Sequence, residues 1–341
     1  MAGTPTIAGP RTGTHPAAGP HGDTVARRRR VARVVLAALT IAVPLAMLAA
    51  CCIGAYPITP QQLLAILRSP DDAALQQARA VLIDIRAPRV VLAALVGIGF
   101  GTAGAAMLIV LGPLLAATPV PVGALPIAAF GGALAVAALV YRLAATRGRL
   151  ALPLLLLAGI AINALAGAAI GLLTYVASDA QLRSLTFWSL GSVGGAQWST
   201  IGAVAPFALA GCAWLARQRH ALNALQLGEM EALHLGVPVQ RVKRGVLIAT
   251  ALGIGALVSC TGVIGFIGLV APHCVRLVCG PDQRIVMPGA ALIGALLTVL
   301  ADLAARTVAA PTEIPLGILT ALIGAPFFLI LLRKRRGALG G

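Results

Sequence analysis

The sequence predicts an all-α protein, a polytopic bundle of membrane-spanning helices. Hydrophobic residues make up 59% of its 341 residues, charged residues make up 11%, and the mean hydropathy is +0.94. A soluble chain of this length could not bury so much apolar surface. Apolar runs long enough to cross about 30 Å of hydrocarbon as helices recur along the whole sequence. Because backbone hydrogen bonds in lipid must close within each segment, and barrel-type alternation is absent, helices are the expected structure.

About nine membrane spans are expected. Glycine and alanine are abundant in them, which favours close contact between helices. In chain order the apolar runs lie near 34–55, 89–117, 121–141, 152–176, 199–216, 245–263, 264–275 (a shorter piece), 286–306 and 315–332.

The spans form one domain, residues 31–336, between two tails. Residues 1–30 are expected to be a disordered cytoplasmic tail, because the first 26 are rich in Gly, Pro, Thr and Ala and show no periodicity. Residues 337–341 form a short second tail. The LAAC stretch at 48–51 resembles a lipoprotein cleavage box behind a basic block. A processed lipoprotein would be soluble, and this chain is not, so we take the first run as a retained membrane helix.

Basic residues are distributed unevenly between the two sides of the predicted spans. The net charge is +16, and 19 Lys and Arg residues flank alternate ends of the apolar runs, whereas six lie in the other loops. This bias predicts a cytoplasmic location for the larger group and for both termini. Attraction to anionic lipid headgroups favours the same arrangement. The basic residues are dispersed and not interleaved with aromatic ones, so a nucleic-acid partner is not expected.

The first half of the chain conflicts with this topology. The N-terminus and the 142–149 loop are both expected inside, which requires an even number of crossings, yet three apolar runs separate them. The run 89–117 has 29 residues, or about 43 Å as a helix, which is one long, tilted span. A short re-entrant hairpin, a misplaced loop and an impaired chain are the open explanations.

Signatures of catalysis and of metal binding are missing from the sequence. The six cysteines form no CxxC pair and mostly lie within or beside apolar runs, where a thiol acts as a small apolar group, and the five histidines show no ligand spacing. A phosphate-binding P-loop requires Gly-Lys-Ser/Thr, but Lys243 and Lys334 are each followed by Arg. We therefore expect no catalytic residue, no bound metal and no cofactor in this chain.

Four segments in the last third of the chain point to a family. They read IGFIGLVAPH (264–273), GPD (280–282), ADLAAR (301–306) and EIPLGILTALIGAPFF (313–328). Together they resemble the permease subunits of bacterial ABC importers for iron chelates, heme and cobalamin, the FecCD-type family. The resemblance implies ten helices per subunit in inverted repeats and a homodimer around a central pathway. It also implies two copies of an ATPase subunit that uses the ATP, a substrate-binding protein, and a multi-pass location in the bacterial cytoplasmic (inner) membrane.

The resemblance has one gap. After its second helix the family has a Gln, a cytoplasmic turn of the RNPLADP type and a Gly/Ser-rich third helix. Here GAAM (104–107) runs directly into LIVLGPLL (108–115). The turn and most of the third helix are missing, which agrees with the odd number of crossings.

The long loop 217–244, on the Arg-rich side, carries LGEMEALHLGV (227–237). This stretch resembles the coupling region of the family, a pair of short helices that sits in a groove of the ATPase subunit. An ordinary cytoplasmic loop is the alternative. Two of its glycines would allow tight turns at the helix ends. The positions that carry the resemblance are Leu227, Gly228, Glu229, Ala232, Leu235 and Gly236.

On the opposite side, DIRAPR (84–89) and ADLAAR contribute Arg86, Arg89 and Arg306. In the family, arginines at these motifs face the binding protein and pair with Glu on its two lobes. Such ion pairs steer docking and fix orientation. One alternative is an arginine that snorkels from a helix end. For Arg306 another is a pair with Asp302, one helical turn earlier.

The segment QLRSLTFWSLGS (181–192) follows the 152–176 span and resembles a short extracellular helix of the family's heme importers. Its Arg183 would meet heme propionates or an anionic siderophore at the mouth of the pathway. Phe187 and Trp188 would lie beside it, and an interfacial anchor in the aromatic belt is the alternative. Asn163 completes the set of pathway residues, although an interhelical hydrogen bond is its simpler role.

The sequence thus predicts the permease subunit of an ATP-driven importer for an iron chelate, with heme ahead of a siderophore and of cobalamin. The missing segment leaves an inactive relic as an alternative. An ion-coupled secondary transporter would need acids in the middle of the helices, and these are essentially lacking.

Overall fold

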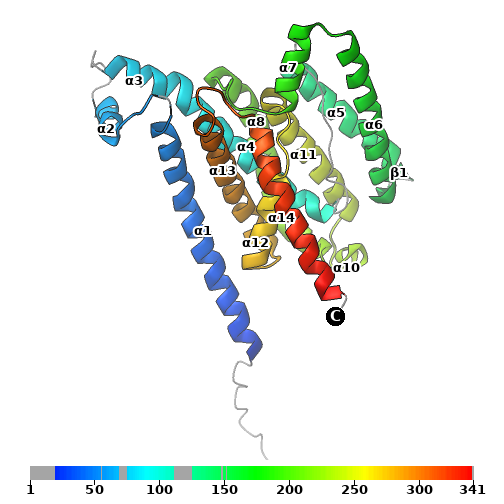
Figure 1. Cartoon of the computed structure of the whole chain (residues 1–341). Coiled ribbons are helices and arrows are strands. Elements are labelled where there is room, and N and C mark those ends of the chain that lie inside the picture. Colours follow the sequence, from blue (N-terminus) through cyan, green and yellow to red (C-terminus); the bar gives the residue numbers. More distant parts are fainter. Residues whose placement is uncertain are drawn as a thin grey trace, which may run out of the picture.

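The computed structural model describes residues 20–54, 56–68, 75–110, 125–146, 149–150 and 152–339. Nearly all of them are helical (Figure 1). The helices are α1 (Pro20–Cys52), α2 (Pro60–Arg68), α3 (Gln76–Ala80), a π-helical turn (Val81–Arg86), α4 (Ala87–Val110), α5 (Leu125–Ala144), α6 (Leu152–Val176), α7 (Asp179–Ser189), α8 (Trp198–Arg217), α9 (Arg219–Leu225), α10 (Glu229–His234), α11 (Val239–Thr261), α12 (Ile267–Cys279), α13 (Gln283–Thr307) and α14 (Leu316–Leu339). Strands β1 (Ala145–Thr146) and β2 (Arg149–Leu150) form one short antiparallel hairpin.

Within the described residues a helix lies in each of the nine predicted apolar runs, namely α1, α4, α5, α6, α8, α11, α12, α13 and α14. Five helices are long and apolar enough to cross a membrane by themselves, at Arg27–Cys52, Leu157–Val176, Trp198–Arg217, Val239–Thr261 and Gln283–Thr307. The all-α prediction is therefore confirmed, and the sequence located the helices because lipid leaves the backbone no other partner than its own segment.

Helix α1 begins earlier than the predicted span. It includes residues 20–30, which the sequence analysis placed in the tail, and the basic block Arg27–Arg30 lies in helix. Arginine is a good helix former, so a short basic stretch in front of an apolar helix extends that helix readily. Residues 1–19 of the expected tail lie outside the described residues.

We name the two ends of the bundle after the sides that the charge bias predicts, inner for the predicted cytoplasmic side and outer for the opposite side. The inner end holds α9 and α10, and the outer end holds α2, α3 and α7 (Figure 1). Helix α1 starts and α14 finishes at the inner end. A cluster of buried residues marks this end, with Ala32 of α1, Ala144 of α5, Leu222 of α9 and Val242 of α11 among its members.

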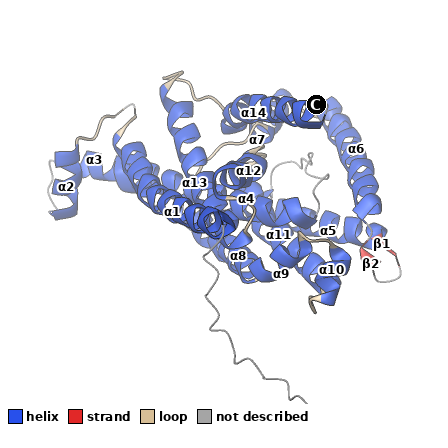
Figure 2. Cartoon of the chain, turned by 90° about the horizontal axis from the view of Figure 1, so that it is seen from below, coloured by secondary structure: helices blue, strands red, loops and turns tan. Residues whose placement is uncertain are grey.

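Helix α4 lies in the middle of the bundle, against α8, α11, α12 and α13 (Figure 2). It runs antiparallel to α13, because its outer residue Arg89 meets Asp302 and its residue Gly101 meets Ala290. A Cβ atom at Gly97 would lie 2.1 Å from the carbonyl oxygen of Gly294. The two helices thus touch backbone to backbone, a contact that only small residues permit.

Helices α4 and α5 both run from the outer end to the inner end. Helix α4 starts at the outer ion pair with Asp302, and α5 finishes at Ala144 in the inner cluster. The conflict over the number of crossings is therefore located between these two helices. The connection that joins them, residues 111–124, lies outside the described residues.

Helix α6 exposes apolar side chains along its whole length. Leu157, Leu165 and Leu172 are each about two-thirds exposed, and within the described residues α6 packs mainly on α5. An exposed apolar surface of this extent requires lipid or another protein surface to cover it.

We predict that Gly294→Ala destabilises the fold, because the added Cβ would meet the backbone of Gly97 at 2.1 Å. Overpacking of this kind costs about 1–3 kcal/mol. The matched control is Gly167→Ala in α6, where no described atom lies within 4 Å of the added Cβ. Thermal unfolding in detergent should show a lower midpoint for Gly294→Ala and an unchanged or slightly higher one for the control. Equal midpoints would contradict the close α4–α13 contact.

Candidate functional site

A buried ion network joins α4, α13 and the loop before α14 at the outer end. Arg89, in the first turn of α4, is 8% exposed. Its Nε donates to Asp302 Oδ1 at 2.9 Å, and its Nη1 and Nη2 donate to the two carboxylate oxygens of Glu313 at 2.8 and 3.0 Å. Asp302 is buried on α13, and its Oδ2 lies 3.5 Å from Arg306 Nε. Buried charges persist only when they are paired in this way.

The other two outer arginines bind the end of α1 and the loop that follows it. Arg86 donates to the carbonyl oxygens of Cys51 at 2.8 Å, Cys52 at 3.2 Å and Tyr56 at 2.5 Å. Arg306 donates to the carbonyl oxygen of Ala50. The last carbonyl groups of a helix have no partner within it and carry a partial negative charge, so cations bind there.

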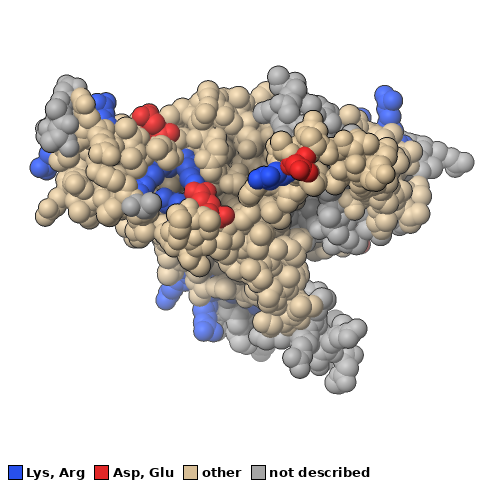
Figure 3. Space-filling view, turned by 45° about the horizontal axis from the view of Figure 1, so that its top comes forward, with Lys and Arg blue, Asp and Glu red and all other residues tan. Residues whose placement is uncertain are grey.

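The three arginines predicted for docking therefore lie together, as the sequence motifs implied, but their guanidinium groups are engaged inside the chain. Arg86 and Arg89 are both buried. The pair between Arg306 and Asp302, which the four-residue spacing allowed, is present. On the outer face, basic and acidic side chains form small mixed groups within an otherwise uncharged surface (Figure 3). Docking by these arginines remains a prediction.

Glu313 is a site residue that the sequence analysis missed, although it opens the EIPLG segment used for the resemblance. The hydrogen bond from Arg89 lowers the pKa of its carboxyl, while partial burial acts in the opposite direction. The signal that could have found it is its position as the one acid between α13 and α14 in the sequence.

The inner loop exposes a small apolar surface, which we call the coupling surface, formed by Leu227, Met230, Leu233 and Leu235, each 52–67% exposed. Ala232 on the opposite face of α10 is fully buried. Gly228 and Gly236 flank α10 with φ angles of 119° and 78°, in the region that favours glycine. Glu229 forms an ion pair with the buried Lys243 of α11. The glycine turns predicted for this segment are confirmed.

The loop between α12 and α13 is tied to α9. Asn223 Nδ2 donates to Asp282 Oδ1 at 2.7 Å, and the backbone N–H of Gln283 donates to Asn223 Oδ1 at 2.8 Å. Asp282 also caps α13 by accepting from the backbone N–H of Arg284 at 3.0 Å. Asn223 was not singled out from the sequence, because a single Asn in a helical stretch has no distinctive pattern. A displacement of α9 and α10 would therefore reach the start of α13.

Helix α7 carries three of the four predicted pathway residues. Arg183 and Phe187 are exposed on it, and Trp188 is half-buried against the bundle. Asn163 lies in the middle of α6, 13 residues before Val176, which corresponds to about 20 Å along the helix. The structure thus groups Arg183, Phe187 and Trp188 and leaves Asn163 apart from them.

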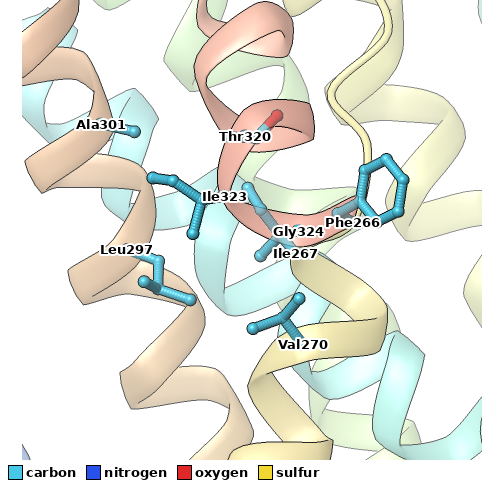
Figure 4. Close-up of a pocket in the computed structure, with 8 residues that line it drawn as sticks. All are labelled: Phe266, Ile267, Val270, Leu297, Ala301, Thr320, Ile323 and Gly324. Carbon is cyan, nitrogen blue, oxygen red and sulfur yellow. The ribbon is translucent and has the colours of Figure 1, made fainter. Parts of the chain in front are cut away.

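A pocket between α12, α13 and α14 is apolar (Figure 4). The hydroxyl group of Thr320, its only polar side-chain group, donates to the carbonyl oxygen of Gly317 at 3.1 Å. The pocket offers no cation for an anionic chelate. It is lined by Phe266, Ile267, Val270, Leu297, Ala301, Thr320, Ile323 and Gly324. Within the part of the chain that the structure describes, no group of three or more His, Cys, Asp or Glu residues is arranged to hold a metal ion.

An apolar helical bundle with five helices long and apolar enough to cross a membrane is typical of a multi-pass membrane protein. The chain belongs to the FecCD transport family, whose model matches residues 39–112 and 102–334. The two matched pieces overlap at residues 102–112, the region in which we expect the family's cytoplasmic turn and third helix to be missing.

Known relatives are ABC permeases. The hemin transport system permease HmuU of Yersinia pestis is 43% identical over 286 residues, which cover 75% of this chain and 84% of the relative. The cobalamin import system permease BtuC of Halobacterium salinarum is 40% identical over 281 residues, which cover 76% of this chain and 75% of the relative. A solved structure described as an inward-facing, metal-chelate type ABC transporter has a TM-score of 0.73 and 29% identity, and covers 89% of this chain and 99% of that one.

We predict that Glu313→Gln lowers stability at neutral pH and not at strongly acidic pH. Because the folded-state pKa of Glu313 lies below its ordinary value of 4.5, the Arg89 pair stabilises the fold above that value and is lost as the pH falls through the lower pKa. The carboxylate is 49% exposed, so the expected contribution is at most about 1 kcal/mol. Unfolding midpoints of the two proteins in detergent should differ at pH 7 and converge near pH 3. An equal difference between the two midpoints at pH 7 and near pH 3 would contradict a stabilising ion pair between Arg89 and Glu313.

Proposed function

We propose that this chain is the membrane-spanning subunit of an ATP-driven importer that moves an iron chelate, with heme as the first candidate, from a binding protein outside the cell into the cytoplasm. The observation that carries the proposal is the 43% identity to a hemin permease over most of both chains. The similarly high identity to a cobalamin permease makes cobalamin the second candidate, and a siderophore is the third.

The proposed mechanism uses both ends of the bundle. A loaded binding protein docks at the outer network of Arg86, Arg89 and Arg306. Two ATPase subunits bind the coupling surface of two copies of this chain. No covalent chemistry occurs in the chain, and rocking of the helix bundles gives alternating access. The extensive apolar exposure of α6 supports a second copy or lipid as its cover.

The proposed pathway passes α7. Arg183 supplies an exposed cation at the outer mouth, which suits the carboxylates of heme or of an anionic siderophore. Phe187, exposed one turn further on, offers an aromatic face to a porphyrin ring. Asn163 acts as an interhelical hydrogen bonder in α6. The apolar pocket of Figure 4 does not compete for this role, since it has no charged lining.

The test is uptake of radiolabelled heme into proteoliposomes that hold this chain, its ATPase subunit and its binding protein, with and without internal ATP. ATP-dependent uptake is the expected result, and labelled cobalamin in a parallel arm separates the first two substrates. Uptake driven by an ion gradient without ATP would point to a secondary transporter. If the assembled complex takes up no chelate and the binding protein does not stimulate its ATPase activity, the chain is an inactive relic.

We also predict that Leu235→Glu weakens binding of the ATPase subunit by about tenfold or more, because a charge would replace an apolar contact within the coupling surface. Leu235 is 64% exposed in the free chain, so the substitution should not disturb the fold. Leu64→Glu is the matched control, since Leu64 is similarly exposed on α2 at the opposite end. Affinity for the purified ATPase subunit is the measurement, and equal affinities of both variants would contradict the proposed coupling surface.

A further inference from the structure

The docking arginine Arg89 already holds a carboxylate. Two of its nitrogens bind the two oxygens of Glu313, and the third binds Asp302. Arg89 is 8% exposed, whereas the Glu313 side chain is 49% exposed and covers it from the outer side. An acidic side chain that approaches Arg89 from outside therefore meets Glu313 first.

We propose that Glu313 is an internal counter-ion, which an acidic side chain of the binding protein displaces from Arg89 when it docks. This inference rests on the proposed function, because it assumes that a binding protein uses Arg89. Docking is then an exchange of one carboxylate for another on the same guanidinium group. The bidentate geometry of the present pair is the geometry that an incoming Glu would reproduce.

The charges of the network support an exchange. The network holds three arginines, Arg86, Arg89 and Arg306, and two acids, Asp302 and Glu313, so these five side chains carry a net charge of +1. Asp302 is buried and shared between two arginines, so it stays in place. Glu313 lies on the loop before α14, and its side chain is 49% exposed. It is the acid that can leave, and its departure raises the positive charge that attracts an acidic partner.

Displacement of Glu313 would also affect the proposed pathway, because Glu313 lies three residues before the start of α14. The backbone N–H of Ile314 donates to Ala305 at 3.0 Å, and those of Leu316 and Gly317 donate to Gly191 and Leu190 at 2.9 and 3.0 Å. These last two bonds join the start of α14 to the end of α7. Release of Glu313 therefore loosens the loop that holds the proposed pathway helix.

Close backbone contacts make this junction sensitive to a small shift. A Cβ at Gly317 would lie 2.3 Å from the carbonyl oxygen of Leu190, and one at Gly194 would lie 3.2 Å from Glu313 Oε2. Gly191 and Gly262 both adopt positive φ angles, 68° and 69°, where α7, α11 and α14 meet. Gly191, Gly262 and Gly317 themselves have no side chain that could absorb a displacement at these contacts.

The first test measures affinity of the complete permease–ATPase complex, in nanodiscs, for the binding protein that supports uptake. Glu313→Gln removes the internal competitor and should tighten binding about three- to tenfold at low salt. Asp84→Asn, which removes another exposed acid from the outer end, should change it less than twofold. A purely structural role for Glu313 predicts weaker or equal binding of the Gln variant, and that result would overturn the proposal.

The second test needs no substrate. Hydrogen exchange at the amides of Ile314, Leu316 and Gly317 should be slow in the wild-type complex, faster in Glu313→Gln, and faster in the wild type once the binding protein is added. If hydrogen exchange at these amides does not change on docking, the proposed displacement of Glu313 is wrong, whereas the proposed importer function is unaffected. Absence of binding by wild type and variant alike would instead overturn the proposed function together with this inference.

Discussion

The backbone contact between α4 and α13 is the constraint on which the two ends of the molecule depend. Gly97, Gly101 and Gly294 have no side chain that would hold the helices apart. Only at this separation does Arg89 reach Asp302 with a hydrogen bond of 2.9 Å. A wider spacing would leave a buried aspartate beside an arginine that no longer touches it, which is the costly arrangement of two unpaired charges. The glycines and the ion pair are thus one structural feature.

Helix α13 is the element that reaches both proposed partner surfaces. Its first residues are held by Asn223 and Asp282 beside the coupling surface, and its last turn carries Asp302 and Arg306 in the outer network. Its 25 residues extend over about 37 Å. A helix packed tightly along its length moves as a rigid body, so a displacement at one end is carried to the other without any chain of flexible side chains.

Local sequence pattern predicted the helices and turns, whereas it missed the contacts between distant parts of the chain. The apolar runs located the helices, and Gly228 and Gly236 marked turns, because these are short-range consequences of residue type. The four-residue spacing of Asp302 and Arg306 predicted a pair that the structure contains. By contrast, Arg89 meets Glu313 across 224 residues of sequence, and Arg86 meets the end of α1 across 30 to 35. Spacing carries no information on such contacts, so the sequence did not reveal that these guanidinium groups also bind groups within the chain.

The family's third helix, which we expect to be missing from this sequence, would bear on transport and not on the proposed partner surfaces. The outer network is built by α1, α4, α13 and the loop before α14, and the coupling surface by α9, α10 and the residues that hold them. The residues that make these contacts all lie outside 102–112, the overlap of the two family matches. A chain that had lost its pathway would therefore still present both surfaces to an ATPase and a binding protein. Assembly of the complex is therefore expected of an active permease and of a relic alike, and what separates them is uptake of a chelate and the response of the ATPase to the binding protein.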